Sequence, residues 1–231
     1  MRNEDVRDYF VAMTRVFRCG NLEVKGFTDG SLKTSLDFVL GMERAASEEL
    51  VGGTNDGSLF IPVNNFLFQR DGATVLIDAG AGKTMQPTLG KLPANLKGAG
   101  IEPADVTHIV LTHMHPDHAN GLVDAAGGAV YPNAEILVQA QELDFWMAES
   151  DGSESDAVKR TRARNKLNMK PYLERIRRGR GARLRPSARA RPFAGPHLLA
   201  YRSGPRRIHR LGRPGAFLRD PDLAPEHRCE I

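Results

Sequence analysis

The sequence predicts an α+β fold over residues 1–176, followed by an irregular segment at 177–231. Short runs of apolar and β-branched residues are typical of buried strands, and between them apolar residues recur at helical spacing. After residue 176 both patterns stop, and Pro and Gly become frequent. A chain of 231 residues with 41% hydrophobic content is long enough to bury one sizeable core.

Strands and helices are expected to alternate along the first region, with Gly and Pro clusters between them. In order, the expected elements are a strand at Leu22–Phe27 with its turn at Asp29-Gly30, a helix at Phe38–Leu50, a strand from Phe60 to Phe68, a strand at Thr74–Asp78, a short helix around Leu92–Ala99, strands at Val106–Leu111 and Ala134–Gln139, and a helix at Ala140–Ala148.

The most informative segment is Leu111–Leu122, which places three imidazoles and a carboxylate within six positions. These residues are His113, His115, Asp117 and His118. Pro116 prevents the preceding strand from continuing, so the cluster is expected on a tight loop at the strand end. Imidazole and carboxylate are ligands that zinc and similar cations accept. Single histidines usually lie on the surface, whereas four ligand-type residues at this spacing indicate a metal site.

The His-x-His-x-Asp-His pattern resembles the signature of the metallo-β-lactamase superfamily. Further segments are similar to its methyl parathion hydrolase and lactonase-like subgroup. They are Pro87-Thr-Leu-Gly-Lys-Leu, Asn95-Leu-Lys, Pro132-Asn-Ala and Asp144-Phe-Trp. The resemblance covers roughly Asn21 to Ile176, and it implies an αββα sandwich of which this region supplies only the N-terminal part.

The resemblance also implies a dinuclear, metal-dependent hydrolase that acts on an ester, lactone or phosphotriester bond. His113 and His115 would hold one divalent ion, and Asp117 and His118 the second. Zinc is expected, with Mn, Fe or Co as alternatives. A hydroxide between the two metals would attack the substrate, and Asp117, the predicted catalytic residue, would help to orient it. Asp78, at a strand end, is expected to orient the loop that carries these four residues, here called the metal loop, by hydrogen bonding.

Several neighbouring residues are expected to be structural rather than functional. Trp146 and Phe145 are predicted to pack in the core. Met114, which lies between the first two histidines, is predicted to pack beneath the loop. His108 is predicted as a histidine on the face of the strand, because it lies back along the chain from the cluster. Asn120 and Gly121 are expected to shape the loop.

Charge divides the chain near residue 177. The segment 177–231 contains 14 Arg, no Lys and 4 acidic residues, a balance of +10 that leaves −6 for residues 1–176 of the overall +4. This composition supports an alternative function, a non-catalytic protein whose basic segment binds nucleic acid through phosphates. The segment has no interleaved aromatics and no recognition module, so specific nucleic-acid binding is not expected.

A shifted reading frame is the preferred interpretation of the same segment, because Arg without Lys is typical of GC-rich coding sequence read out of frame. Moved by one base, Ala190–Leu198 permits Pro-Gly-His-Ser-Pro-Gly-His-Thr, and Leu211–Leu218 permits Trp-Gly-Asp-Leu-Val-His-Phe. These resemble the family's third histidine ligand and its metal-bridging Asp, here 17 codons apart. We therefore expect a frame break near Arg177–Arg183. As written, the chain should fold poorly and be nearly inactive for lack of those ligands.

The remaining expectations concern partners and location. The two cysteines, Cys19 and Cys229, indicate no disulfide framework, and no segment resembles a signal peptide or a membrane span. A cytoplasmic location is expected, although a misassigned start codon would allow export. The expected partner is a small-molecule substrate, with no membrane and no specific nucleic acid, and a homodimer is compatible with the sequence.

Overall fold

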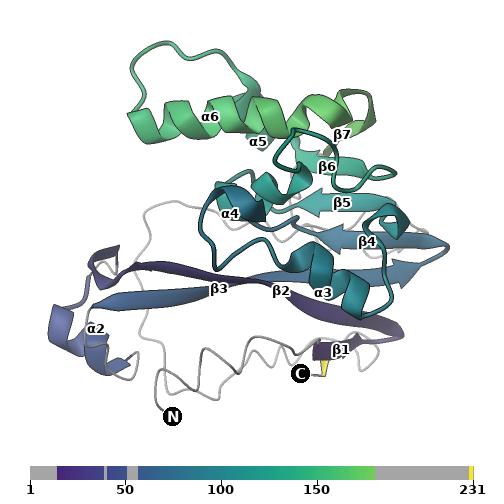
Figure 1. Cartoon of the computed structure of the whole chain (residues 1–231), viewed down its shortest axis with the longest axis horizontal. Helices are drawn as coiled ribbons and strands as arrows, with labels where there is room; N and C mark the ends of the chain where they lie inside the picture. The colour runs from purple at the N-terminus through teal and green to yellow at the C-terminus, as the bar shows by residue number, and fades with distance from the viewer. Residues whose placement is uncertain (1–14, 39–40, 51–56, 180–228, 231) are drawn as a thin grey trace, which may run out of the picture.

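The computed structural model describes residues 15–38, 41–50, 57–179 and 229–230. They form one mixed, eight-stranded sheet in the order β7-β6-β5-β4-β3-β2-β1-β8 (Figure 1). The pairs from β4 to β7 are parallel, and the pairs from β8 to β4 are antiparallel. The strands are β1 (Arg15–Cys19), β2 (Leu22–Ser35), β3 (Ser58–Arg70), β4 (Ala73–Ile77), β5 (His108–Leu111), β6 (Glu135–Gln139), β7 (Ile176–Gly179) and β8 (Cys229–Glu230). The predicted α+β class is confirmed.

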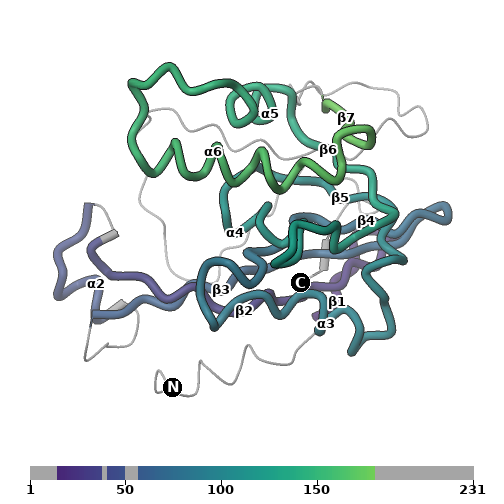
Figure 2. Tube along the Cα trace, turned by 45° about the horizontal axis from the view of Figure 1, so that its top comes forward, coloured from purple at the N-terminus to yellow at the C-terminus, as the bar shows by residue number. Residues whose placement is uncertain are grey.

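Helices α3 to α6 lie along one face of the sheet (Figures 1 and 2). They belong to the connections between the parallel strands, which must cross from one end of the sheet to the other. The helices are η1 (Leu36–Phe38), α2 (Arg44–Leu50), η2 (Gly82–Thr84), α3 (Leu92–Gly98), η3 (Pro103–Asp105), α4 (Pro116–Ala119), η4 (Asn120–Leu122), α5 (Ala140–Met147), α6 (Asp156–Met169) and η5 (Lys170–Arg175). Within the described ranges, none of these helices has the length and apolarity needed to cross a bilayer.

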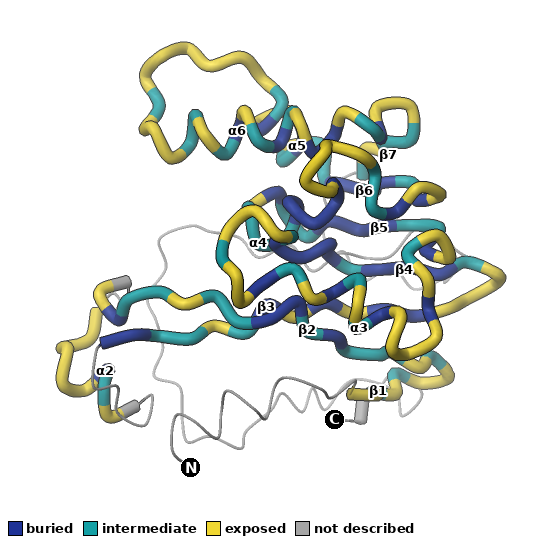
Figure 3. Tube along the Cα trace, in the orientation of Figure 1, coloured by how far each residue is buried: buried dark blue, intermediate teal, exposed yellow. Residues whose placement is uncertain are grey.

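The main core lies between these helices and the sheet. Alternate residues of the central strands, including Leu76, Ile109 and Ile136, are fully buried against it. A smaller cluster on the opposite face centres on Phe68 and Val110, and all of its described members are strand residues or flank a strand. Burial is therefore greatest along β4, β5 and β6, whereas the α5–α6 connection is mostly exposed (Figure 3).

Strand β2 does not end at a turn, which corrects the prediction for Asp29-Gly30. The strand continues to Ser35, and its register with β3 shifts between Thr28 and Gly30. Gly30 adopts φ +120°, and a Cβ at this position would lie 2.0 Å from the Thr88 carbonyl oxygen. The Asp-Gly pair is thus a β-bulge inside one long strand, where glycine allows both the backbone conformation and the close approach.

The bulge turns Asp29 into the interior, where it has no exposed surface. One carboxylate oxygen accepts the N–H groups of Ala81 (2.9 Å) and Gly90 (3.1 Å), and the other accepts that of Leu92 (3.0 Å). Burial raises the pKa of Asp29 even though these hydrogen bonds act to lower it. A residue predicted to lie in a turn therefore anchors the connection from β4 to α3.

One predicted helix differs in its bounds, and one helix was not predicted. Of the predicted helix at Phe38–Leu50, the α-helical part is α2 (Arg44–Leu50), and the 3-10 turn η1 (Leu36–Phe38) precedes it. The unpredicted helix, α6, begins after Ser155, whose side chain accepts the Val158 N–H at 3.4 Å. The helix escaped prediction because polar side chains, rather than an apolar stripe, make up much of its buried face; Asn165 and Asn168 are examples.

Short parts of the segment 177–231 are strands rather than irregular. Strand β7 runs to Gly179 at the edge of the sheet, where Arg177 stays exposed and pairs with Glu135. An edge strand needs only backbone partners on one side, so arginine is compatible with it. Strand β8 places Cys229 opposite Cys19. Cys19 is disulfide-bonded, although the two cysteines alone did not predict a disulfide. The shifted-frame motifs and the rest of this segment lie outside the described residues.

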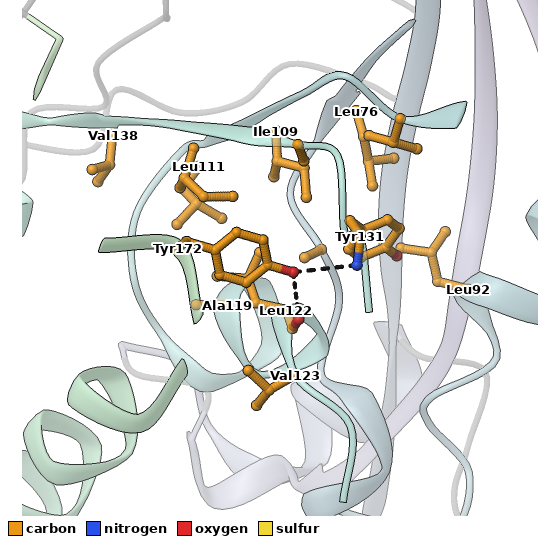
Figure 4. Packing of buried hydrophobic residues seen from close by; sticks show 14 of the residues in the cluster. Leu76, Leu92, Ile109, Leu111, Ala119, Leu122, Val123, Tyr131, Val138 and Tyr172 are labelled. Atoms are coloured by element: carbon orange, nitrogen blue, oxygen red, sulfur yellow. Dashed lines mark hydrogen bonds between the residues drawn. The ribbon is translucent and has the colours of Figure 1, made fainter. Parts of the chain in front are cut away.

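Two buried tyrosines differ in how their hydroxyl groups are satisfied. The Tyr172 hydroxyl donates to the Leu122 carbonyl oxygen at 2.7 Å and accepts the Tyr131 N–H at 3.2 Å (Figure 4). The Tyr131 hydroxyl has no hydrogen-bond partner in the described part of the chain. Tyr172 therefore joins η5 to the segment that follows the histidine cluster, whereas the Tyr131 ring contributes only packing.

Replacing these tyrosines by phenylalanine should give opposite results. Tyr172→Phe leaves the buried Tyr131 N–H without its acceptor and removes one of the two donors to the Leu122 carbonyl oxygen, which keeps the Val130 N–H. The change should lower the free energy of unfolding by about 1–3 kcal/mol. Tyr131→Phe removes an unsatisfied hydroxyl and should be neutral or stabilising. Urea denaturation followed by circular dichroism measures both, and equal destabilisation by the two changes would contradict this assignment.

Candidate metal centre

The structure brings the four predicted ligands together just beyond the end of β5. The ring centroid of His113 lies 4.6 Å from that of His115 and 4.0 Å from that of His118. The expected tight loop is in part a helix, because Pro116 begins α4. Proline is compatible with the first helical turn, where its missing N–H would have no intrahelical acceptor.

Asp117 and His118 face each other at the spacing of two ligands on one ion. The Asp117 Oδ2 atom lies 3.3 Å from His118 Nε2. Two ligands of a tetrahedral zinc ion, each at about 2.1 Å, are about 3.4 Å apart. The other imidazole nitrogen, His118 Nδ1, lies 2.8 Å from Asp78 Oδ2. A carboxylate behind an imidazole in this way orients the ring and increases its basicity toward a metal.

Asp78 holds a second part of the same loop. Its Oδ1 atom accepts the Thr112 N–H at 2.8 Å, and its two oxygens accept the Thr112 hydroxyl at 3.0 and 2.9 Å. The Thr112 hydroxyl also lies 3.0 Å from His113 Nδ1. Because the hydroxyl donates to Asp78, it must accept from His113 Nδ1–H, which leaves His113 Nε2 with its lone pair free.

The pKa values of two imidazoles in the cluster shift in opposite directions. Burial lowers the pKa of His118, but hydrogen bonds to Asp117 and Asp78 outweigh this effect and raise the pKa to about 9. Burial lowers the pKa of His113, and the neighbouring positive charges of His118 and His115 lower it further. Burial acts to raise the pKa of Asp117, but the hydrogen bond to His118 brings it below its usual value. The region therefore favours a positive charge near His118.

The donor types fit a divalent cation, but the ligand set is incomplete. In the described part of the chain, no group of three or more His, Cys, Asp or Glu side chains is arranged to hold a metal ion. The spacing of Asp117 and His118, the free nitrogen of His113 and the carboxylate behind His118 are each features of metal ligation. These residues therefore fit part of a metal site, and a closed site needs further donors.

Glu142 is a neighbour of the site that was not among the predicted site residues. Its Oε2 atom accepts the backbone N–H of Met114 and the indole N–H of Trp146. Met114 and Trp146 are buried as expected, and the Trp146 ring meets His115 edge-on at 5.7 Å. Phe145 was expected in the core but is 50% exposed. The i, i+4 spacing of Glu142 and Trp146 on one predicted helix was the available signal.

A close backbone contact joins the metal loop to the segment after β4. The Ala79 N–H donates to the His118 carbonyl oxygen at 2.8 Å, and the Gly121 N–H donates to the Gly80 carbonyl oxygen at 2.9 Å. A Cβ on Gly121 would lie 1.9 Å from the Ala79 carbonyl oxygen. Gly121 is therefore required by space, which agrees with its predicted role in shaping the loop.

Comparison with protein families matches residues 59–195 to the metallo-beta-lactamase superfamily. The matched range contains His113, His115, Asp117 and His118, and it extends beyond residue 176, where the sequence predicts the regular region to end.

Two curated relatives are similar over part of the chain. This chain is 37% identical over 89 residues to Metallo-beta-lactamase domain-containing protein 1 of Xenopus laevis, and the match covers 36% of this chain and 34% of that protein. It is 34% identical over 85 residues to N-acyl homoserine lactonase AiiB of Agrobacterium fabrum, covering 29% of this chain and 30% of the lactonase. The chain thus matches about a third of the length of each of these relatives.

Two solved structures share the arrangement of the described residues. The hydrolase AbOPH of the beta lactamase superfamily superposes with a TM-score of 0.68 and 26% identity, covering 74% of this chain and 62% of AbOPH. The dizinc quorum-quenching lactonase AidC superposes with a TM-score of 0.65 and 24% identity, covering 77% of this chain and 64% of AidC. The second likeness concerns the fold alone.

Substitution of Gly121 tests the contact between the two loops. Gly121→Ala should force the metal loop away from Ala79 and lower the free energy of unfolding by about 1–3 kcal/mol. Gly98→Ala is the matched control, because a Cβ there meets nothing within 4 Å and α3 gains a better helix former. Thermal denaturation compares the two, and a Gly121→Ala protein as stable as Gly98→Ala would contradict the predicted clash.

Proposed function

Because the chain belongs to the metallo-beta-lactamase superfamily, we propose that it is part of a metal-dependent hydrolase that cleaves an ester, lactone or phosphotriester bond in a small molecule. The observation that carries the proposal is the 3.3 Å approach of Asp117 and His118 beside His113 and His115. The sequence similarity to the hydrolase AbOPH and to the lactonase AiiB supports this reaction class.

Each predicted ligand has a proposed role. His113 and His115 would hold one divalent cation, and Asp117 and His118 a second, with zinc as the preferred metal. Such cations supply Lewis acidity and lower the pKa of water toward neutrality when they are bound. Asp78 fixes the His118 ring with Nε2 toward the site, and Asp117 would also orient the attacking water through its second carboxylate oxygen.

The complete site requires donors beyond the described residues, and we propose that the segment after Gly179 supplies them in a shifted frame. The incomplete ligand group supports this proposal. So does the composition of the segment 177–231, with 14 Arg and no Lys. In the frame as written, the chain would bind each metal weakly, because four ligands shared between two ions leave both under-coordinated.

Removal of one predicted ligand tests the proposed function. His115→Ala, in the frame-restored protein, should abolish hydrolysis and deplete bound metal, because one ion loses an imidazole donor. His108→Ala is the control, since His108 lies at the start of β5 and its Nδ1 atom contacts the Thr107 hydroxyl. Metal content by mass spectrometry and a panel of aryl ester, lactone and phosphotriester substrates provide the measurements. Full metal content and full turnover in His115→Ala would refute the assignment.

Sequencing of the coding region tests the proposed frame break separately. An inserted or deleted base should lie near the codons of residues 177–183, and restoring the frame should raise both metal affinity and the cooperativity of unfolding. An uninterrupted read, together with tight metal binding by the chain as written, would show that the frame is correct.

A further inference from the structure

The residue between the first two histidines, Met114, is held from both sides by side chains that come later in the sequence. Its side chain is fully buried. Its N–H donates to Glu142 Oε2 at 3.0 Å, and its carbonyl oxygen accepts the Asn165 side-chain N–H at 2.8 Å. Glu142 lies on α5 and Asn165 on α6, so two helices converge on this one residue.

These two hydrogen bonds act on two different peptide planes. The Met114 N–H belongs to the plane that joins His113 to Met114, and the Met114 carbonyl belongs to the plane that joins Met114 to His115. Peptide groups are planar and rigid, so the side-chain directions of the two histidines depend on how these planes are turned. Glu142 therefore fixes one plane and Asn165 the other.

Glu142 also reaches the second histidine through an aromatic ring. Its Oε2 atom accepts the Trp146 indole N–H at 2.9 Å, and the Trp146 ring meets the His115 ring edge-on with centroids 5.7 Å apart. Trp146 is only 6% exposed. One carboxylate oxygen thus restrains both the backbone before Met114 and the ring that packs against His115.

Helix α6 and the 3-10 turn after it continue the same support along the loop. Asn165, Asn168 and Tyr172 follow one another at spacings of three and four residues, which places them on one helical face. Asn168 Nδ2 donates to Asn120 Oδ1 at 2.9 Å, and Tyr172 donates to the Leu122 carbonyl oxygen. The loop is therefore held at its beginning, middle and end by one polar stripe.

We propose that Glu142 and Asn165 are positioning residues that clamp the Met114 peptide groups and so set the directions of His113 and His115 for metal binding. This inference rests on the proposed function. Residues that orient metal ligands without touching the metal typically contribute about 10- to 100-fold to metal affinity. Glu142 and Asn165 should therefore influence metal affinity more than they influence global stability.

The test measures Co²⁺ binding to the full chain by visible absorption, together with residue-resolved amide hydrogen exchange at Met114. Glu142→Ala and Asn165→Ala should each weaken Co²⁺ binding by about 10- to 100-fold. Glu142→Ala should in addition accelerate exchange of the Met114 N–H. Glu142→Gln keeps an acceptor oxygen and should recover much of the affinity and the protection.

Two controls separate positioning from general stability. Asp144→Ala removes a carboxylate from the same helix that is exposed and pairs with Arg178, so Co²⁺ binding and Met114 exchange should not change. Tyr172→Phe lowers stability without touching the Met114 peptide groups. If Tyr172→Phe weakens Co²⁺ binding as much as Glu142→Ala at equal loss of stability, the clamp has no positioning role and the proposal is wrong.

The remaining outcomes are also decisive. Unchanged Co²⁺ affinity in both Glu142→Ala and Asn165→Ala overturns the proposal. If Glu142→Ala fails to fold, Asn165→Ala and Glu142→Gln decide it by the same two measurements. If the parent chain binds Co²⁺ too weakly to measure, as expected when four ligands are shared between two ions, the clamp is decided by whether Glu142→Ala accelerates exchange of the Met114 N–H, and the proposed function is decided separately by His115→Ala in the frame-restored protein.

Discussion

The carboxylate of Asp78 joins the end of β4 to the loop that follows β5, and the arrangement of the histidine cluster depends on this junction. Strands β4 and β5 are parallel, so their carboxyl ends meet at one edge of the sheet. Asp78 leaves β4 with a φ of 60°, a left-handed conformation that costs energy for a residue other than glycine. Its hydrogen bonds to Thr112 and His118 offset that cost. The local strain is thus maintained by the contacts that organise the site.

The support of the metal loop is polar because the loop is buried but irregular. A buried N–H or carbonyl group outside a helix or strand must find a partner in the backbone or in a side chain, or it loses the hydrogen bond that water gave it. Met114 shows the consequence, since the side chains of Glu142 and Asn165 supply the partners of its N–H and its carbonyl oxygen. An apolar residue in place of Asn165 on α6 would leave the Met114 carbonyl oxygen without this partner. This requirement explains why the inner face of α6 carries asparagine.

The same requirement marks the limit of prediction from the sequence. Strands β2 to β6 and the histidine cluster were predictable, because apolar runs and the His-x-His-x-Asp-His spacing are local patterns. Helix α6 was not, because its buried face is largely polar and the partners of Asn165 and Asn168 lie 51 and 48 residues away in sequence. Asp29-Gly30 was read as a turn, since the same dipeptide suits a hairpin. Its role as a bulge depends on Ala81, Gly90 and Leu92, which no local pattern connects to it.

Electrostatics leads to the same residues as geometry. His118 lies between the carboxylates of Asp78 and Asp117, and these two groups raise the pKa of its imidazole to about 9 in spite of burial. Two partly buried carboxylates require a nearby positive charge, because an uncompensated charge away from water is costly. In the protein alone, the protonated imidazole supplies that charge. Any cation that binds between Asp117 and His118 satisfies the same demand, so the carboxylates that hold the ring in place also make this position favourable for a positive ion.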